Sequence, residues 1–125
     1  MQPPIYRARK IDSNEYIEGY YEFISGQHIL HDDKHIRHYS VSEIDESTLS
    51  IHLDETTDIN GKKIFASLSE NGKGGDIVSD GDMRWYLMFS KRDGCFKGRE
   101  INDFNLKLNL DYWNFKTVSK IGIKQ

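Results

Sequence analysis

The stretch RWYLMFSKRDGCFKG, residues 84–98, contains the clearest strand signal in the chain. Its first seven residues are rich in aromatic and aliphatic side chains, which favour a β-strand. The Asp93–Gly94 pair that follows is the commonest short-range signal of a hairpin turn. The residues from Phe96 to Ile101 then predict a returning strand. We therefore expect an antiparallel hairpin over residues 84–101.

Other segments have the same β character. YIEGYYEF, residues 16–23, is dense in β-forming residues and follows the turn-like DSNE. It predicts a strand whose hairpin partner is IYRAR, residues 5–9. Asn60–Gly61 predicts a further tight turn, and SENGKGG, residues 69–75, predicts a loop.

Two segments have weaker patterns. SVSEIDESTLSIHL, residues 40–53, predicts a short helix starting at Ser42 or Glu43, followed by a strand from Leu49 to Leu53. NFKTVSKIGI, residues 114–123, predicts a final strand, although its apolar spacing fits a helix as well. The expected fold is a mainly β, mostly antiparallel domain with one short helix.

Length and composition limit the class of protein. The chain has 125 residues, the size of one ordinary domain. Hydrophobic residues make up 37% and charged residues 30%, which excludes a disordered chain and a membrane protein. No apolar run approaches the roughly 18 residues of a membrane span, and the N-terminus lacks the apolar centre of a secretion signal. The single cysteine, Cys95, excludes an intrachain disulfide. We expect a cytoplasmic protein without membrane contacts.

Charge is distributed unevenly. Residues 1–80 contain 8 basic and 15 acidic residues, a charge of −7, whereas residues 81–125 contain 9 and 5, a charge of +4. This asymmetry permits an anionic partner at the C-terminal part, or head-to-tail self-association. Solvated strand faces are the simpler explanation.

The stretch HILHDDKHIRH, residues 28–38, contains four of the five histidines. On a helix all four would share one face and could ligate Zn²⁺: His28, His31, His35 and His38. A hairpin with residues 32–34 as its turn fits the flanking sequence better. It pairs His31 with His35 and His28 with His38 on opposite faces, so four ligands cannot meet one metal ion. We expect solvated cross-strand histidines and no metal site.

Three motifs occur in order along the chain: YRARKIDSNEYIEGYYEF (6–23), DINGKKIF (58–65) and GGDIV (74–78). The first is similar to an aromatic-Arg strand that turns into Trp-x-x-Gly-Tyr. The others are similar to Asp-x-Asn-Gly-Lys-x-Ile-aromatic and Glu-Gly-Asp-Ile-Val. In this order the motifs resemble the YopX family of phage and prophage proteins. RWYLMFSKRDGCFKG and DYWNFKTVSKIGI stand where that family places its last strands.

The resemblance implies a β-rich, small-barrel fold of SH3-like character, encoded by a phage or an integrated element in a bacterial host. It spans nearly the whole chain, so we expect one YopX-like domain over residues 1–125, with two possible lobes at about 1–58 and 59–125. It implies no catalytic residues, cofactor or substrate. Two departures concern the middle of the chain: ASLSENGKG, residues 66–74, is inserted between the second and third motifs, and LDETTDING, residues 53–61, replaces the family's Gly-Leu.

Catalytic motifs are absent from the sequence: it has no Gly-x-x-x-x-Gly-Lys-Ser/Thr, no Gly-x-Ser-x-Gly and no His-Glu-x-x-His. Five carboxylates could be imagined as a nuclease or Mg²⁺ cluster: Asp45, Glu46, Asp54, Glu55 and Asp58. A solvated acidic edge explains them equally well. We expect neither an enzymatic activity nor a cofactor.

Two functions from different classes follow. The first is a non-catalytic interaction module of a phage or prophage, which contacts an unknown protein partner and self-associates as a homo-oligomer. The second is a small-barrel protein that binds nucleic acid through its C-terminal part: Arg84, Trp85, Lys91, Arg92, Lys97 and Arg99, with Lys107, Tyr86, Phe96, Tyr112 or Trp113 in support. The second function requires several of these aromatic side chains to be exposed on the basic face.

Overall fold

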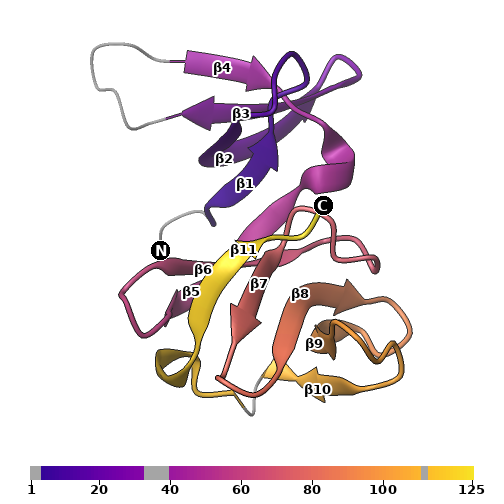
Figure 1. Cartoon of the computed structure of the whole chain (residues 1–125). Helices are drawn as coiled ribbons and strands as arrows, with labels where there is room; N and C mark the ends of the chain where they lie inside the picture. Colours follow the sequence, from indigo (N-terminus) through magenta and orange to yellow (C-terminus); the bar gives the residue numbers. More distant parts are fainter. Residues whose placement is uncertain (1–3, 33–39, 111–112) are drawn as a thin grey trace.

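The computed structural model describes residues 4–32, 40–110 and 113–125 (Figure 1). This part of the chain is mainly β. Its N-terminal half contains β1 (Tyr6–Arg9), β2 (Tyr16–Ile24), β3 (Gln27–Asp32), β4 (Ser40–Glu43), the 3₁₀ helix η1 (Glu46–Thr48) and β5 (Ser50–Thr57). Its C-terminal half contains β6 (Lys63–Ser67), β7 (Asp76–Ser79), β8 (Arg84–Ser90), β9 (Cys95–Glu100), β10 (Lys107–Asn109), the 3₁₀ helix η3 (Phe115–Thr117) and β11 (Ser119–Ile123). Within these ranges no helix is long and apolar enough to cross a membrane.

Strands β1 to β4 form the upper part of Figure 1. β1 pairs with β2 on one side and with the start of β5 on the other, and β3 and β4 follow β2 in sequence order. Directly after β4 the chain returns to the end of β1, where Ile44 bridges to Lys10. This small sheet therefore curls toward closure, and η1 then leads into β5.

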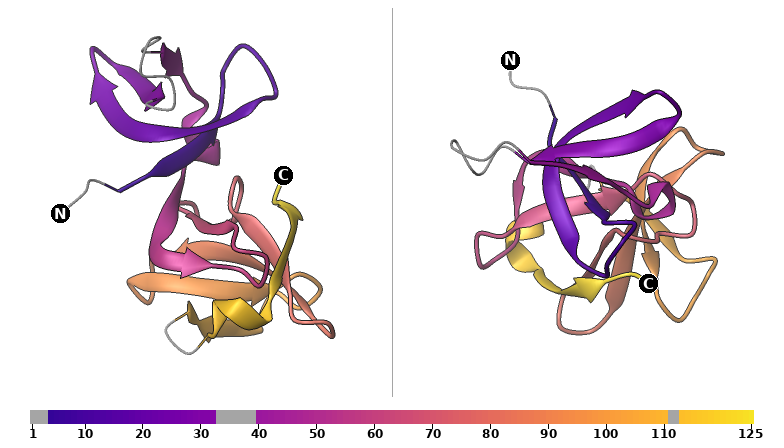
Figure 2. Two further views of the ribbon diagram at one scale, coloured as in Figure 1. Left: turned by 90° about the vertical axis from the view of Figure 1, so that its left-hand side faces the viewer. Right: turned by 90° about the horizontal axis from the view of Figure 1, so that it is seen from above.

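β5 joins the two halves of the molecule without a separate linker. Ile51 of β5 pairs with Tyr6 on one side and with Ala66 of β6 on the other. β6 meets β8 in a parallel pair at Ser67 and Met88, and β8 pairs with β7 and β9. One hydrogen-bonded path thus runs β10-β9-β8-β6-β5-β1-β2-β3-β4, while β11 pairs with β7. The result is a curled, open sheet that forms a half-barrel (Figure 2).

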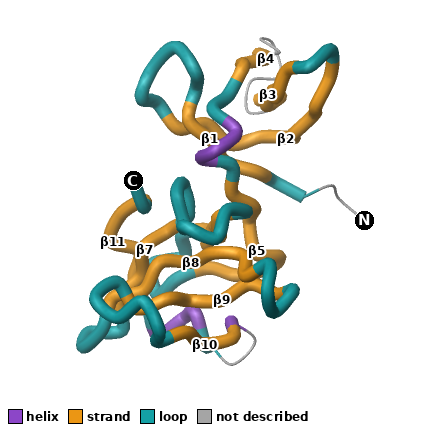
Figure 3. The backbone as a smooth tube through the Cα atoms, turned by 90° about the vertical axis from the view of Figure 1, so that its right-hand side faces the viewer, coloured by secondary structure: helices purple, strands orange, loops and turns teal. Residues whose placement is uncertain are grey.

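Two apolar clusters fill the two halves. The first comprises Ala8, Leu30, Ile44 and Leu49. The second lies under β6, β7 and β8 and comprises Ile64, Ala66, Val78, Trp85, Leu87, Leu110, Phe115 and Val118. Figure 3 shows the corresponding groups of strands, with β5 leading from one into the other. Because β5 pairs with strands of both halves, the expected lobes at about 1–58 and 59–125 stay a prediction.

Most of the expected strands are present. The hairpin over 84–101 occurs as β8 and β9, and Gly94 has a φ of 68° in its turn. The expected helix at Ser42 or Glu43 is wrong, because both residues lie in β4. The helical turn begins instead at Glu46. Asp45 caps it, because its side chain accepts the Ser47 N–H.

Candidate functional site

A buried carboxylate lies where the two halves meet. Asp76, at the start of β7, is 0% exposed, and its Oδ1 lies 2.8 Å from Nη1 of Arg7 in β1. This contact is an ion pair by distance, without the alignment of a hydrogen bond. Asp76 Oδ2 accepts the Phe65 N–H at 2.8 Å and lies 3.1 Å from Nζ of Lys120 in β11. One side chain therefore connects β1, β6 and β11.

The Arg7 guanidinium has further partners within the chain, although its buried Nε has no hydrogen-bond partner among the described residues. Its Nη2 donates to the Gly74 carbonyl at 2.7 Å, and it lies 4.6 Å from the centre of the Phe65 ring. Lys120 Nζ donates to the Lys63 carbonyl at 2.8 Å. Because these charges are already compensated by neighbours, the cluster is suited to holding the two halves together rather than to binding a ligand.

Asp58 is a second buried carboxylate, next to the Asn60–Gly61 turn. It accepts the N–H groups of Asn60 and Lys62 at 2.9 Å and that of Lys120 at 3.0 Å. Burial opposes the charged form, but the bonds from Lys120, Lys62 and Asn60 outweigh it and lower the pKa of Asp58 below its ordinary value of 3.8. Asp58 therefore fixes the turn against β11.

The three sequence motifs supply these two structural carboxylates and their neighbours. Arg7 comes from the first motif, Asp58 and Phe65 from the second, and Gly74 and Asp76 from the third. The segment 66–74 returns to the same place, since its last carbonyl accepts the bond from Arg7. A role in fold stability accounts for these motif residues without any chemistry.

Trp85, a candidate for stacking on nucleic-acid bases, is instead part of the core. Both Trp85 and the neighbouring Tyr86 are buried. Phe96 and Trp113 pack, partly buried, against the second apolar cluster. Tyr112 lies outside the described residues. The four described aromatic candidates therefore do not form an exposed stacking surface.

The basic candidates do not form a single surface either. Arg84 is exposed at the start of β8, whereas Lys91 and Arg92 are exposed in the turn after its end. A strand of seven residues separates them by roughly 20 Å. Lys97 Nζ lies 2.9 Å from the carboxylate of Asp93, so its charge is partly neutralised.

Arg99 has an unusual environment. It is 5% exposed, its Nη1 donates to the Tyr86 hydroxyl at 3.1 Å, and its guanidinium carbon lies 4.1 Å from the centre of the Phe104 ring. Its buried Nε has no hydrogen-bond partner, and none of the ion pairs between described residues includes Arg99. Phe104 is 68% exposed.

The histidine hairpin has a different register from the expected one. His31 pairs with Val41 rather than with His35. The expected turn was too short, because β4 begins only at Ser40. His35 and His38 lie outside the described residues.

The two described hairpin histidines have side-chain partners of their own. His28 forms a hydrogen bond with the Tyr21 hydroxyl and lies 3.1 Å from Glu46. His31 Nε2 lies 3.2 Å from Glu22. In the part of the chain that the structure describes, no group of three or more His, Cys, Asp and Glu residues could hold a metal ion.

The acidic candidates of residues 45–58 are separated. Asp45 precedes β5 and pairs with Arg9 at 2.6 Å. Asp58 follows β5 and accepts the backbone N–H groups of Asn60, Lys62 and Lys120. Asp45 and Asp58 therefore lie beyond opposite ends of the eight-residue strand β5. The hypothesis of a Mg²⁺ site that uses both carboxylates is wrong.

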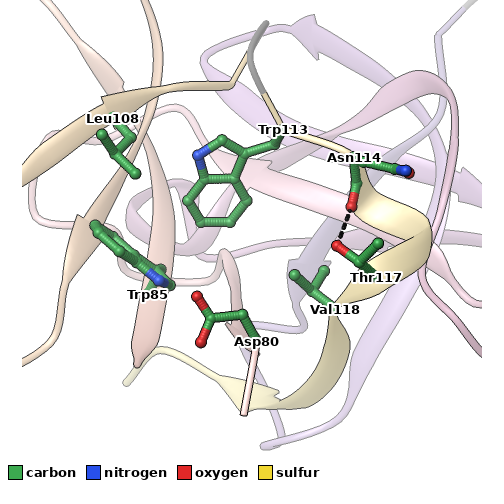
Figure 4. Close-up of a pocket in the computed structure, with 7 residues that line it drawn as sticks. All are labelled: Asp80, Trp85, Leu108, Trp113, Asn114, Thr117 and Val118. Atoms are coloured by element: carbon green, nitrogen blue, oxygen red, sulfur yellow. Dashed lines mark hydrogen bonds between the residues drawn. The ribbon is translucent and has the colours of Figure 1, made fainter. Parts of the chain in front are cut away.

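A pocket of about 180 Å³ lies beside β8 (Figure 4). The edge-to-face indoles of Trp85 and Trp113, 5.4 Å apart, form its apolar wall. The Asp80 carboxylate lies near both rings, and N–H bonds from Met83 and Asp82, with the Trp85 side chain, lower its pKa. Asn114 and Thr117 also line the pocket, and the Thr117 hydroxyl donates to the Asn114 carbonyl at 2.7 Å. These contacts do not make a pair of nucleophile and base.

Comparisons with protein-family models, curated proteins and solved structures find no match. The candidate sites are therefore judged by their geometry. Sequence reasoning missed two features, the ionic contacts of Asp76 and the stack of Phe104 on Arg99. The sequence around Asp76 contains no signal for its ionic contacts. For Arg99 and Phe104 the one signal is their short separation along the chain.

Proposed function

We propose that this protein is a non-catalytic interaction module of a phage or prophage that contacts a protein partner. The supporting observation is one face of the β2–β3–β4 sheet, which we call the outer face. Strand pairing and alternation give it these members: Tyr20, Glu22, Ile24, Gln27, Ile29, His31, Val41 and Glu43. Ile29 is buried in the centre of this set. Ile24 and Val41 are each about half exposed, at 50% and 48%.

The outer face combines apolar and acidic groups. The opposite face of the same sheet carries Leu30, which belongs to the first apolar cluster. Exposed aliphatic side chains next to Glu22 and Glu43 are suited to a partner with an apolar centre and a basic rim. A second copy of this chain offers basic charge in its residues 81–125, so self-association belongs to the same proposal.

The family and the finer fold are part of the proposal. We infer one YopX-like domain of SH3-like barrel character over residues 1–125. Support comes from the strand order β5-β1-β2-β3-β4, the 3₁₀ helix before β5, and the bridge between Lys10 and Ile44. Further support comes from the three motifs, which contribute residues around Asp76 and Asp58. A bacterial cytoplasmic location stays a prediction.

Affinity capture from phage-bearing bacterial cells tests the protein-binding proposal. We expect Ile24→Asp to lose the proteins that the parent captures. Ile59→Asp is the matched control, because Ile59 is similarly exposed but lies in the turn after β5. Sedimentation of the purified parent over a range of concentrations identifies a second copy as the partner. Equal capture by the parent and Ile24→Asp would remove the outer face from the proposal.

Nucleic-acid binding is the second candidate function. One observation favours it: the exposed Phe104 ring is stacked on a buried arginine that has no carboxylate partner among the described residues. Fluorescence anisotropy of labelled single-stranded and duplex DNA and RNA, at low and physiological salt, tests it. Binding in the micromolar range that weakens steeply with salt supports this function, and no binding at low salt rejects it.

A further inference from the structure

The protein contains two arginines of equal burial, Arg7 and Arg99. The Nε of each is buried without a hydrogen-bond partner, so the two differ in the compensation of their charge rather than in this atom. Both are 5% exposed. Arg7 has the carboxylate of Asp76 within ion-pair distance, whereas Arg99 has a phenol hydroxyl and two aromatic rings. A charge removed from water is strongly destabilised unless an opposite charge or hydrogen bonds compensate it. Arg99 therefore retains capacity to bind an anion.

The neighbours of Arg99 are also basic. Lys107 lies directly opposite it across β9 and β10. Tyr86 lies opposite it on β8, with Arg84 two residues away on the same face. Lys124 Nζ lies 5.5 Å from the centre of the Tyr86 ring. Three further basic residues therefore lie near Arg99 and Tyr86: Arg84, Lys107 and Lys124.

The nearby acids have other partners. Asp93, on which the charge of Lys107 acts, forms the ion pair with Lys97. Glu100 accepts the Asn102 N–H, and Asp103 accepts the Asn105 N–H. No acid among the described residues therefore forms an ion pair with Arg99.

We propose that Arg99 and Phe104 form a binding site for a phosphate ester that carries a planar base, either a free nucleotide or a unit of single-stranded nucleic acid. The guanidinium of Arg99 and the ammonium of Lys107 bind the phosphate. The ring of Phe104, once it has turned off the guanidinium, stacks on the base. Only the polymer form rests on the second proposed function; the nucleotide form is independent of both functions.

The loop between β9 and β10 explains how such a ligand reaches a buried arginine. Phe104 covers the guanidinium from a six-residue connection, 101–106, and its ring is mostly in solvent. Rotation of this one side chain uncovers Arg99 without disturbing either strand. The base then takes up the contact with Phe104 while the phosphate takes up the unpaired Nε.

The first test is a titration with adenosine monophosphate, followed by nuclear magnetic resonance of the arginine Nε–H groups. We expect the Arg99 Nε–H signal to shift on binding. Phe104→Ala should weaken nucleotide binding about fivefold or more, because it removes one stacking contact. Inorganic phosphate should bind more weakly than the nucleotide and should lose no affinity in Phe104→Ala, because this variant leaves Arg99 uncovered. Arg92→Gln, an exposed change of equal charge to Lys107→Gln, is the control and should bind like the parent.

The second test uses a labelled oligothymidylate and the same variants. Lys107→Gln should lower the slope of log affinity against log salt by about 0.7, the value for one phosphate contact on a single strand. Arg92→Gln should leave the slope unchanged. Phe104→Ala and Lys107→Gln both alter side chains outside the core, so these measurements do not depend on whether an Arg99 variant folds.

The outcomes separate the site from the function. Nucleotide binding that is equal in Phe104→Ala and the parent, or that leaves Arg99 Nε–H unshifted, overturns the site. Oligothymidylate binding that is equal in the parent, Phe104→Ala and Lys107→Gln overturns the site but supports nucleic-acid binding elsewhere on the protein. Nucleotide binding through Arg99 without tighter oligomer binding supports the site and rejects the nucleic-acid function. No binding of either ligand rejects both.

Discussion

At the scale of single residues, Asp76 has the largest expected effect on stability. It is fully buried and interacts with Arg7, Lys120 and the Phe65 N–H. Its removal would leave a guanidinium buried without its anion and a buried N–H without an acceptor. Both losses destabilise the fold, because the guanidinium and the N–H group lose their hydration on folding and no longer gain the contact with Asp76 that compensates for it.

We therefore predict that Asp76→Ala lowers the free energy of unfolding by about 3–5 kcal/mol. Urea denaturation followed by circular dichroism measures the change. Glu18→Gln is the control, because Glu18 also reaches across the halves, to Lys63 at 3.6 Å, but through a partly solvated ion pair. Its cost should be about 0–1 kcal/mol. Equal costs for the two variants would contradict the structural role of Asp76.

Asp58 gives a prediction for pH dependence. Because its pKa is depressed in the folded protein, its charged form stabilises the fold. This stabilisation is complete above the ordinary value of 3.8 and is lost as the pH falls through the lower folded pKa. Unfolding free energies measured from neutral pH to below pH 3.8 should therefore fall more steeply for the parent than for Asp58→Asn. Identical slopes would show that Asp58 does not contribute to acid unfolding.

The features that neighbouring residues encode could be predicted from the sequence. The contacts between residues far apart in the sequence could not. The Asn60–Gly61 turn is encoded by neighbouring residues, and Gly61 has the expected positive φ of 79°. The contact of Arg7 with Asp76 joins residues far apart in sequence, and nothing beside Arg7 indicates which acid it meets. The burial of Trp85 and Arg99 likewise depends on strands and loops that pack over them.

At the scale of strands and turns, alternation and turn residues predicted pairing wherever the loop was short. The hairpin of β8 and β9 follows from its apolar run and Asp93–Gly94. The register of β3 and β4 was mispredicted because the length of their connection is not encoded in the strands themselves. The short helix was placed too early because Asp45, the residue that caps it, lies after β4.

Gly75 gives a prediction for the way β7 enters the sheet. A Cβ atom there would lie 2.4 Å from the Leu87 carbonyl oxygen and 2.7 Å from the Ser67 nitrogen. Both atoms belong to backbone that cannot move aside, so Gly75→Ala should destabilise the fold by about 1–3 kcal/mol or more. Gly122→Ala is the control in β11, where no atom lies within 4 Å, and should change stability by less than about 0.5 kcal/mol. Thermal denaturation of both variants measures the difference in stability. Similar melting temperatures for Gly75→Ala and Gly122→Ala would contradict the predicted clash at Gly75.

At the scale of the whole molecule, the contacts of Asp76 couple two apolar clusters. Both tryptophans, Trp85 and Trp113, belong to the second cluster or pack against it, so their fluorescence reports only that half. Circular dichroism reports the strands of both halves. The two signals together therefore measure whether the halves unfold as one unit.

We predict that the two signals give coincident urea transitions for the parent and separate transitions for Asp76→Ala. The first half should lose its structure earlier in the variant, because Arg7 in β1 loses its anchor in β7. Coincident transitions in the variant would mean that β5 alone couples the halves. Separate transitions in the parent would mean that the halves are independent throughout.

The position of Lys120 in the last strand has a consequence for protein synthesis. A ribosome synthesises Arg7 first, Asp76 much later and Lys120 later still, yet all three belong to one ionic cluster. β11 also supplies the N–H that completes the contacts of Asp58. The nascent chain therefore cannot complete this cluster before β11 has been synthesised, and a message with a stop codon shortly before position 119 should yield a less stable product.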